Sequence, residues 1–251
     1  MITIKSKDEI MKMDKAGDIV IGMHEALRDY IKPGLTTLEI DAFCENFIRE
    51  HGGIPAQIGY NGYPYATCTS VNDEICHGFP SDYVLKDNDL LTVDTVVELD
   101  GYMADSAWSY LVGEGSEENK KLMDITRECL YLGIEQAVAG NRLGDIANAI
   151  QTNAEKHGYS VVKEFTGHGI GTSMHEDPQV LHYGKAGRGQ RLSEGMVITI
   201  EPMINTGHWK SQIDDNGWTA RTIDGGISCQ YEHTLAITED GPVILTKQSG
   251  E

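Results

Sequence analysis

The chain has 251 residues, of which 40% are hydrophobic and 24% charged, the composition of a globular rather than a disordered protein. Its formal net charge of −19 argues against a protein that wraps nucleic acid or lies on an anionic membrane. The N-terminus lacks the apolar segment of a signal peptide, no run reaches the ~18 apolar residues of a membrane span, and the five cysteines show no C-x-x-C spacing. We therefore expect a cytoplasmic protein with one domain over 1–251.

Apolar residues at helical spacing predict two helices in each half of the chain. In the first half, each helix begins at a capping box, in which a Ser or Thr side chain and a Glu three residues later satisfy each other's backbone. Each of the four helices is followed by a Gly or Pro residue. The predicted helices run from Ser6 to Pro33, from Thr36 to His51, from Glu117 to Val138 and from Asp145 to Lys156.

Further motifs recur in the two halves in the same order. The recurring motifs are H-x-x-P at 77–80 and 175–178, Thr-Val-Asp at 92–94 with Thr-Ile-Glu at 199–201, and a carboxylate at the start of a last strand, Asp105 and Glu232. Four matches in one order, counting the helices that end at His-Gly, indicate a divergent repeat. Such a repeat implies a pseudo-two-fold axis, across which the acidic residues of the two halves would meet.

The segment 90–112 alternates like two strands around an Asp-Gly pair at 100–101, which is a favoured hairpin turn. A two-residue turn there places Asp94 opposite Ala107 and Asp105 diagonally beside Asp94 on the same face. Aspartate is depleted in strands, and two like charges on one face repel each other. The pattern therefore favours a cation between the two carboxylates.

Three side chains of the second half have similar settings. Glu201 ends a strand at 197–200 and is followed by Pro202, and Glu232 lies in the segment leading into the last strand. His168 is expected in a loop, where glycines on both sides would let the backbone pack closely around a ligand. The candidate ligands are Asp94, Asp105, His168, Glu201 and Glu232. Oxygen and nitrogen ligands without a thiolate suit two divalent metals of the Mn, Fe, Co or Zn kind, with a bridging water as nucleophile.

These motifs resemble those of the type I methionine aminopeptidases, which are pita-bread metallopeptidases, over nearly the whole chain. The matching segments are IGYNGYPYATCTSVNDEICHGFP, LLTVDTVVELDGYMADSAW, FTGHGIGTSMHEDPQVLHY, EGMVITIEPMIN and ISCQYEHT. The resemblance implies an α+β pita-bread fold, in which two pseudo-two-fold-related halves share a curved antiparallel sheet flanked by helices. It also implies that 1–251 form a single catalytic metallopeptidase domain, expected to act as a monomer.

The resemblance further implies two divalent metal ions per chain (Co, Mn, Fe or Zn). Asp94 would hold one ion, His168 and Glu201 the other, and Asp105 and Glu232 would bridge both. Glu201 would also take the proton of the attacking water and pass it to the leaving amine. Two histidines complete the implied catalytic set: His175 would donate to the developing oxyanion and His77 to the scissile amide.

A methionine side chain would lie in an aromatic pocket, which suits a flexible thioether. The residues implied for it are Tyr60, Tyr63, Cys68, His77 and Trp218, with His175 also contacting substrate. Two positions depart from the family pattern: Met174 replaces an aromatic residue, and Gln57 replaces a common pocket cysteine. Cys229 is also unusual, and we interpret it as a small buried apolar residue rather than an oxidisable thiol.

The implied partners are the N-termini of nascent polypeptides whose second residue is small. Two basic clusters, Lys5/Lys7/Lys12/Lys15 and Lys185/Arg188/Arg191, are interpreted as solvated surface, with a transient ribosome contact as the alternative. A pita-bread aminopeptidase specific for X-Pro is a rival interpretation, although such relatives usually carry an extra N-terminal domain. A non-catalytic pita-bread binding protein is the other, although such proteins lose metal ligands and none is missing here.

Overall fold

The computed structural model describes residues 1–250, and the helices fall in two pairs along this part of the chain. The pairs are α1 (Lys7–Tyr30) with α2 (Thr37–Glu50), and α3 (Glu117–Glu135) with α4 (Leu143–Lys156). Both predicted capping boxes are present, at Ser6 and Thr36. The third helix ends earlier than predicted, because Gln136 N–H bonds to Gly133 O at 3.0 Å and tightens the last turn. The fourth begins earlier, because the Asp145 carboxylate accepts the N–H of Arg142 at 2.7 Å.

The strands also divide between the halves. In the first half they are β1 (Ile54–Pro55), β2 (Cys68–Val71), β3 (Glu74–Cys76), β4 (Leu90–Leu99) and β5 (Tyr102–Leu111), with a 3₁₀ turn at Tyr60–Gly62. In the second half they are β6 (Ser160–Val161), β7 (Gly167–Gly169), β8 (Glu176–Val180), β9 (Val197–Ile200), β10 (Met203–Asn205), β11 (Ser211–Ile213), β12 (Ala220–Thr222), β13 (Ser228–Gln230), β14 (His233–Thr238) and β15 (Gly241–Ile244).

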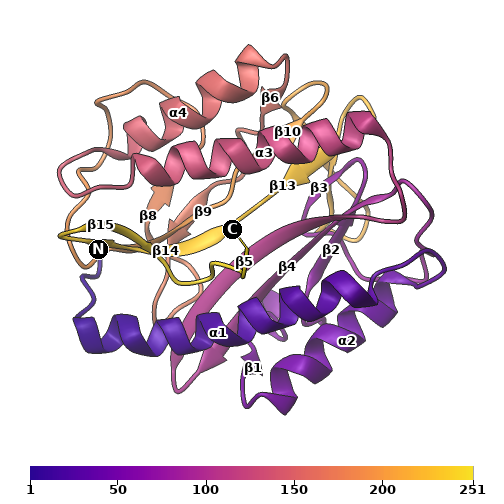
Figure 1. Cartoon of the computed structure of the whole chain (residues 1–251), viewed down its shortest axis with the longest axis horizontal. Coiled ribbons are helices and arrows are strands. Elements are labelled where there is room, and N and C mark those ends of the chain that lie inside the picture. Colours follow the sequence, from indigo (N-terminus) through magenta and orange to yellow (C-terminus); the bar gives the residue numbers. More distant parts are fainter. Residues whose placement is uncertain (251) are drawn as a thin grey trace.

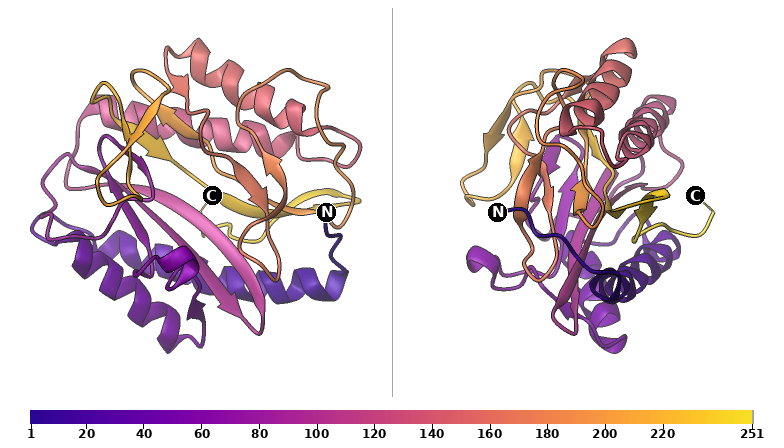
Figure 2. Two further views of the ribbon diagram at one scale, coloured as in Figure 1. Left: turned by 180° about the vertical axis from the view of Figure 1, so that it is seen from behind. Right: turned by 90° about the vertical axis from the view of Figure 1, so that its left-hand side faces the viewer.

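Besides two three-stranded sheets, β13-β10-β6 and β11-β12-β3, each half contains a larger antiparallel sheet, and the helices of each half lie beside it (Figures 1 and 2). The first sheet has the order β1-β4-β2 with β5 paired to β4, and the second has the order β15-β14-β9-β7-β8. Buried side chains from both halves belong to one continuous hydrophobic core, including Val20, Val93, Leu130, Ile150 and Ile198. The architecture is the predicted α+β pita-bread arrangement of two related halves.

The long hairpin has the register predicted from its turn. β4 and β5 pair from end to end, with Asp94 opposite Ala107 and Asp105 opposite Val96. Asp100 and Gly101 both have positive φ, as the turn requires. Asp105, however, lies inside β5 rather than at its start, because the tight turn lets the strand begin at Tyr102.

The two halves join where β5 meets the start of β14. Asp105 N–H donates to Thr234 Oγ1 at 3.0 Å, and the same hydroxyl donates to Asp105 O at 2.8 Å. Ser106 Oγ donates to Glu232 O at 2.8 Å, and Glu232 N–H donates to Ala107 O at 2.8 Å. These contacts bring one carboxylate of each half to the same point, as the internal repeat predicts.

Two predictions about the second half need correction. His168 lies on strand β7, not in a loop, and its neighbours are glycines because other backbone passes close by. A Cβ at Gly167 would lie 2.5 Å from Thr199 O, and one at Gly169 would lie 2.2 Å from Asp177 O. The glycines therefore allow close packing of β7 between β8 and β9 rather than packing around a ligand.

A third prediction that needs correction is the solvent exposure of Lys5. Lys5 was expected on a solvated face, but its side chain is only 4% exposed and pairs with Glu176. The rest of its cluster, Lys7, Lys12 and Lys15, is exposed. Within residues 1–250, none of the helices combines the length and apolar character needed to cross a membrane.

Candidate functional site

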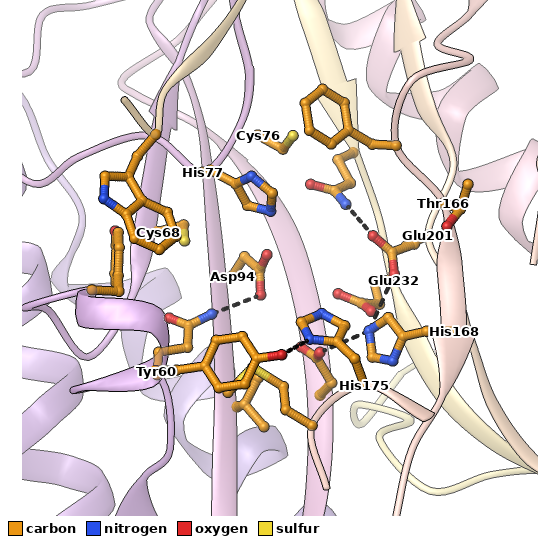
Figure 3. Close-up of a pocket in the computed structure, with 18 of the residues that line it drawn as sticks. Tyr60, Cys68, Cys76, His77, Asp94, Thr166, His168, His175, Glu201 and Glu232 are labelled. Carbon is orange, nitrogen blue, oxygen red and sulfur yellow. Dashed lines mark hydrogen bonds and ion pairs between the residues drawn. The ribbon is translucent and has the colours of Figure 1, made fainter. Parts of the chain in front are cut away.

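A cavity of about 360 Å³ opens between the two halves and is lined by residues of both. Figure 3 shows Asp94, His168, Glu201 and Glu232 pointing into it, with His77, His175 and Tyr60 around them. All residues predicted for the site contribute to its lining: Tyr60, Tyr63, Cys68, His77, Asp94, Asp105, His168, His175, Glu201, Trp218 and Glu232. Residues more than 170 positions apart in the sequence thus share one cavity.

Three of the five predicted ligands form a tight group in this cavity, Glu201 lies beside them, and Asp94 lines the same cavity. One ligand atom each from Asp105, His168 and Glu232 lie within 4.8 Å of one another, and all three residues are buried. His168 Nε2 is 3.5 Å from Asp105 Oδ2 and 3.6 Å from Glu201 Oε1. Such a spacing leaves room for a cation among carboxylates that otherwise face one another.

The hydrogen bonding of the carboxylates tests whether metals fit. Asp105 Oδ1 and Glu232 Oε1 are buried side-chain oxygens that have no hydrogen-bond partner in the described structure. An unpartnered buried charge is costly, whereas a bound cation would satisfy both oxygens. The residues present therefore fit divalent metals that prefer carboxylate and imidazole ligands.

The electrostatics of the cluster support the same interpretation. Burial raises the pKa of Asp94 well above its usual value, and the neighbouring Asp105 carboxylate raises it further. Burial, followed by the charges of Asp105 and Glu201, raises the pKa of Glu232 in the same way. Burial also raises the pKa of Glu201, to about 8. A cation at the centre would reverse these shifts, because it stabilises the ionised form of each carboxyl.

Several polar residues that the sequence analysis did not single out orient the ligands. Thr199 Oγ1 donates to Glu201 Oε1 at 2.9 Å and accepts the N–H of His168 at 3.0 Å. Gln230 Nε2 donates to Glu201 Oε2 at 3.3 Å, and the Glu201 N–H donates to His182 Nε2 at 3.1 Å. Thr199 could have been noticed, because it shares a strand face with Glu201 two residues on.

The tautomer of His168 follows from its backbone contact. His168 Nδ1 lies 2.9 Å from Gly169 O, and a carbonyl oxygen can only accept a hydrogen bond. Nδ1 therefore carries the hydrogen, and Nε2 presents its lone pair to the carboxylate cluster. This orientation is the one that an imidazole metal ligand requires.

His175 lies at the cavity mouth, next to His168. The two ring centroids are 4.3 Å apart, and Tyr60 Oη lies 2.7 Å from His175 Nδ1. Burial, followed by the charges of His168 and His77, lowers the pKa of His175 to about 4. His175 is therefore a neutral imidazole at pH 7, and in the tautomer that accepts the Tyr60 hydrogen at Nδ1, its Nε2–H is a donor.

The opposite wall is aromatic and apolar. The rings of Tyr63 and Trp218 have centroids 5.0 Å apart, and His77 packs edge-on against Phe165. Cys68 lies on the same side of the cavity (Figure 3). Both departures from the family pattern, Gln57 and Met174, line this cavity as well.

Gln57 and Cys229 have defined contacts. Gln57 Nε2 donates to Asp94 Oδ1 at 3.4 Å, so that the amide touches a predicted metal ligand. Cys229 is fully buried with its Sγ 3.4 Å from Ser109 Oγ, and burial raises the pKa of its thiol to about 12. A buried thiol with a raised pKa agrees with the interpretation of Cys229 as a small packing residue.

Comparison with known proteins places this arrangement in a family. Residues 11–239 match metallopeptidase family M24. The chain belongs to this family. It is 49% identical over 246 residues to methionine aminopeptidase A of Synechocystis, and this match covers 98% of the chain and 97% of the relative. The crystal structure of methionine aminopeptidase from Rickettsia prowazekii superposes with a TM-score of 0.97 at 42% identity, covering 98% of this chain and all of that one.

Solved structures of prolidases share this fold. The prolidase from Pyrococcus furiosus superposes with a TM-score of 0.80 at 25% identity. The match covers 98% of this chain but only 66% of the prolidase, so that the rest of that longer protein has no counterpart in it. Similarity is therefore both higher and more complete toward methionine aminopeptidases.

Proposed function

We propose that this M24 protein removes the N-terminal methionine from polypeptides whose second residue is small. The observation that carries the proposal is the cavity itself, where two carboxylate pairs and His168 meet beside a wall of Tyr63, Cys68 and Trp218. Its volume of about 360 Å³ suits one side chain and the start of a peptide, not a folded segment. The near full-length similarity to methionine aminopeptidases supports this over an X-Pro peptidase or a binding protein without activity.

Two divalent ions are proposed for the carboxylate cluster, drawn from Co, Mn, Fe and Zn. Asp94 would hold one ion, His168 and Glu201 the other, and Asp105 and Glu232 would be shared by both. Bound there, the ions would acidify a shared water and supply a nucleophile near neutral pH. The unpartnered oxygens of Asp105 and Glu232 are the groups that such ions would satisfy.

The remaining steps belong to side chains of this chain. Glu201, held at both oxygens by Thr199 and Gln230, would accept the proton of the attacking water and pass it to the leaving amine. His175, with Tyr60 fixing its Nδ1, would donate from Nε2 to the oxyanion that develops on the scissile carbonyl. His77, on the first-half side of the cavity, would donate to the scissile amide.

Substrate selection would follow from the shape of the cavity. A flexible thioether makes favourable contacts with aromatic edges and sulfur, such as those of Tyr63, Trp218 and Cys68. Asp105, His168 and Glu232 are buried, so that a chain extending past them on the N-terminal side of the methionine would meet the packed interior. We therefore infer an exopeptidase whose substrates are the N-termini of nascent chains.

Cellular context is proposed on the same basis. We propose that residues 1–251 act as one catalytic domain, as a monomer in the cytoplasm.

The exposed Arg188 and Arg191, close to Lys185 in sequence, offer a basic patch on an otherwise acidic protein, suited to transient contact with the ribosome. The matched test is association of the purified protein with ribosomes before and after exchange of these three residues for glutamine.

The decisive experiment is hydrolysis of Met-Ala-Ser compared with an Ala-Pro peptide by the purified protein loaded in turn with each of the four metals. We expect release of methionine from Met-Ala-Ser with at least one metal and little cleavage of the Ala-Pro peptide. Preferential cleavage of Ala-Pro would overturn the specificity, and cleavage of neither with metal bound would overturn the activity.

A further inference from the structure

The ion pair between Lys5 and Glu176 lies outside the cavity yet touches the segment that carries His175. Its nitrogen and oxygen are 2.5 Å apart, and the two side chains are only 4% and 12% exposed. Lysine and glutamate are rarely buried, and a buried pair is a weak source of stability because desolvation offsets its attraction. A role in orientation explains the buried position better than a contribution to stability.

The pair joins three segments around the candidate site. Lys5 N–H donates to Gly195 O at 2.7 Å, in the turn that leads into β9 and hence to Glu201. Its ammonium reaches Glu176, the first residue of β8 and the residue directly after His175. The N-terminal segment, drawn in indigo in Figure 2, rises from α1 to reach these second-half strands.

The packing around the pair is tight. A Cβ at Gly171 would lie 2.6 Å from Lys5 Cε and 2.7 Å from Glu176 Oε1, so that a larger residue there would have to displace the side chains of the pair. Ser173 N–H points to Glu176 Oε1 at 3.4 Å, and Gly171 O accepts the N–H of Met103 from the first-half hairpin. The loop from 171 to 176 is thus fixed at both ends, and within residues 1–250 Lys5 is the only cation that pairs with Glu176.

We propose that Lys5 is a positioning residue for His175, acting through Glu176. By neutralising and holding the Glu176 carboxylate, the ammonium sets where the loop places the adjacent imidazole, while Tyr60 fixes the ring from the cavity side. The neighbouring pair of the Met1 ammonium with Asp177 has highly exposed side chains, so that solvent weakens it and it contributes little to this anchoring. This inference rests on the proposed role of His175.

The test is Lys5→Met, assayed with Met-Ala-Ser after metal loading. We expect kcat to fall by about 10-fold to 100-fold, as it does when groups that orient a functional side chain are lost, with KM changed by less than about threefold. Lys7→Met and Asp177→Asn are matched controls on the same two segments, and each should stay within about twofold of the wild type. A folded Lys5→Met variant with wild-type kcat would overturn the proposal.

Measuring Lys5→Met in the His175→Ala variant distinguishes a positioning role of Lys5 from general damage to the fold. If Lys5 acts through His175, Lys5→Met should lower kcat by less than about twofold when His175 is already alanine. An equal loss in both backgrounds would overturn the proposal. Should Lys5→Met fail to fold, Glu176→Gln, which keeps the side-chain size, decides in the same way: a lowered kcat supports the proposal and an unchanged one overturns it.

A readout without turnover completes the experiment. In the metal-free protein, amide hydrogen exchange at 173–176 should become faster in Lys5→Met and stay unchanged in Asp177→Asn. Unchanged exchange in Lys5→Met would overturn the anchoring. If the wild type releases no methionine, or if His175→Ala is fully active, the proposed function fails, and hydrogen exchange still decides whether Lys5 holds the loop.

Discussion

The first half of the molecule presents both of its candidate ligands on one hairpin, whereas the second half assembles its ligands from one three-residue strand and the ends of two others. Asp94 and Asp105 are fixed relative to each other by the continuous pairing of β4 with β5. His168 lies on β7, Glu201 follows β9 and Glu232 precedes β14. A side chain on a long, paired strand needs little further support, whereas ligands at strand ends need neighbours to orient them.

The hydrogen bonds reflect this difference. In the second half, Glu201 has contacts from Thr199 and Gln230 to its two oxygens and a backbone contact to His182. In the first half, Asp94 has one long contact from a supporting residue, Gln57 at 3.4 Å, besides its contact with Asp105. Substituting a supporting residue of the second half should therefore weaken metal binding more than substituting a supporting residue of the first half.

Removal of metal should have the largest effect, because it acts on both halves. Chelation is expected to abolish methionine release. Burial raises the pKa of Asp105 from 3.8 to about 7 and that of Glu201 from 4.5 to about 8 in the protein without metal. The folded state then retains protons that the unfolded chain releases, so the free energy of unfolding should fall as pH rises from about 4 to 8.

The size and direction of this pH effect can be measured by denaturant unfolding of the metal-free protein. The expected loss is on the order of 1 kcal/mol per pH unit for each affected carboxyl. Added Mn²⁺ should restore stability, and most strongly near pH 8, where metal binding no longer has to displace these protons. A metal-free protein that becomes more stable between pH 5 and 8 would contradict the assignment.

Glu201→Gln should have the next largest effect. The substitution keeps the side-chain size but removes the proposed base and one charge from the centre, so that kcat should fall by ~10³-fold or more while the fold is retained. Steady-state kinetics with measured metal content, beside circular dichroism, would test this. Near-normal turnover by the metal-loaded variant would remove Glu201 from the mechanism.

Variants of the two H-x-x-P histidines, His77 and His175, allow a direct comparison of what each half contributes to kcat. His175→Ala should cost ~10²-fold in kcat, as loss of an oxyanion donor does. Tyr60→Phe should reproduce part of that loss, because it removes only the hydroxyl that lies 2.7 Å from His175 Nδ1. Parallel measurement of His77→Ala and His175→Ala on Met-Ala-Ser would show whether the two positions are equivalent, and an unchanged rate for His175→Ala would exclude the donor role.

The smallest expected effects come from the supporting residues. Thr199→Val keeps the side-chain shape but removes the hydroxyl shared by His168 and Glu201, and should weaken metal binding by ~10-fold. Gln57→Leu should weaken it by less than about threefold, because Asp94 is held by the hairpin. Titration of each metal-free variant with Mn²⁺ would measure both, and equal losses would refute the contrast between the halves.

Local patterns explain how much of the fold could be predicted. The capping boxes at Ser6 and Thr36 and the hairpin register around Asp100 depend on residues a few positions apart, and the structure confirms them. The family and its fold were likewise predicted from the motifs around the five candidate ligands, and the comparisons confirm both. The roles of the individual site residues stay predictions that the variants above would test.

The sequence by itself determined which side chains could form the site, because an acidic residue inside an apolar strand pattern is anomalous wherever that strand lies. Only the tertiary structure decided what supports them. The contacts of Gln230 and His182 with Glu201, of Tyr60 with His175, and of Lys5 with Glu176 span from 19 to 171 positions. No local periodicity encodes such pairs, since they arise only when distant segments of the chain pack together and bury polar groups that must then find partners.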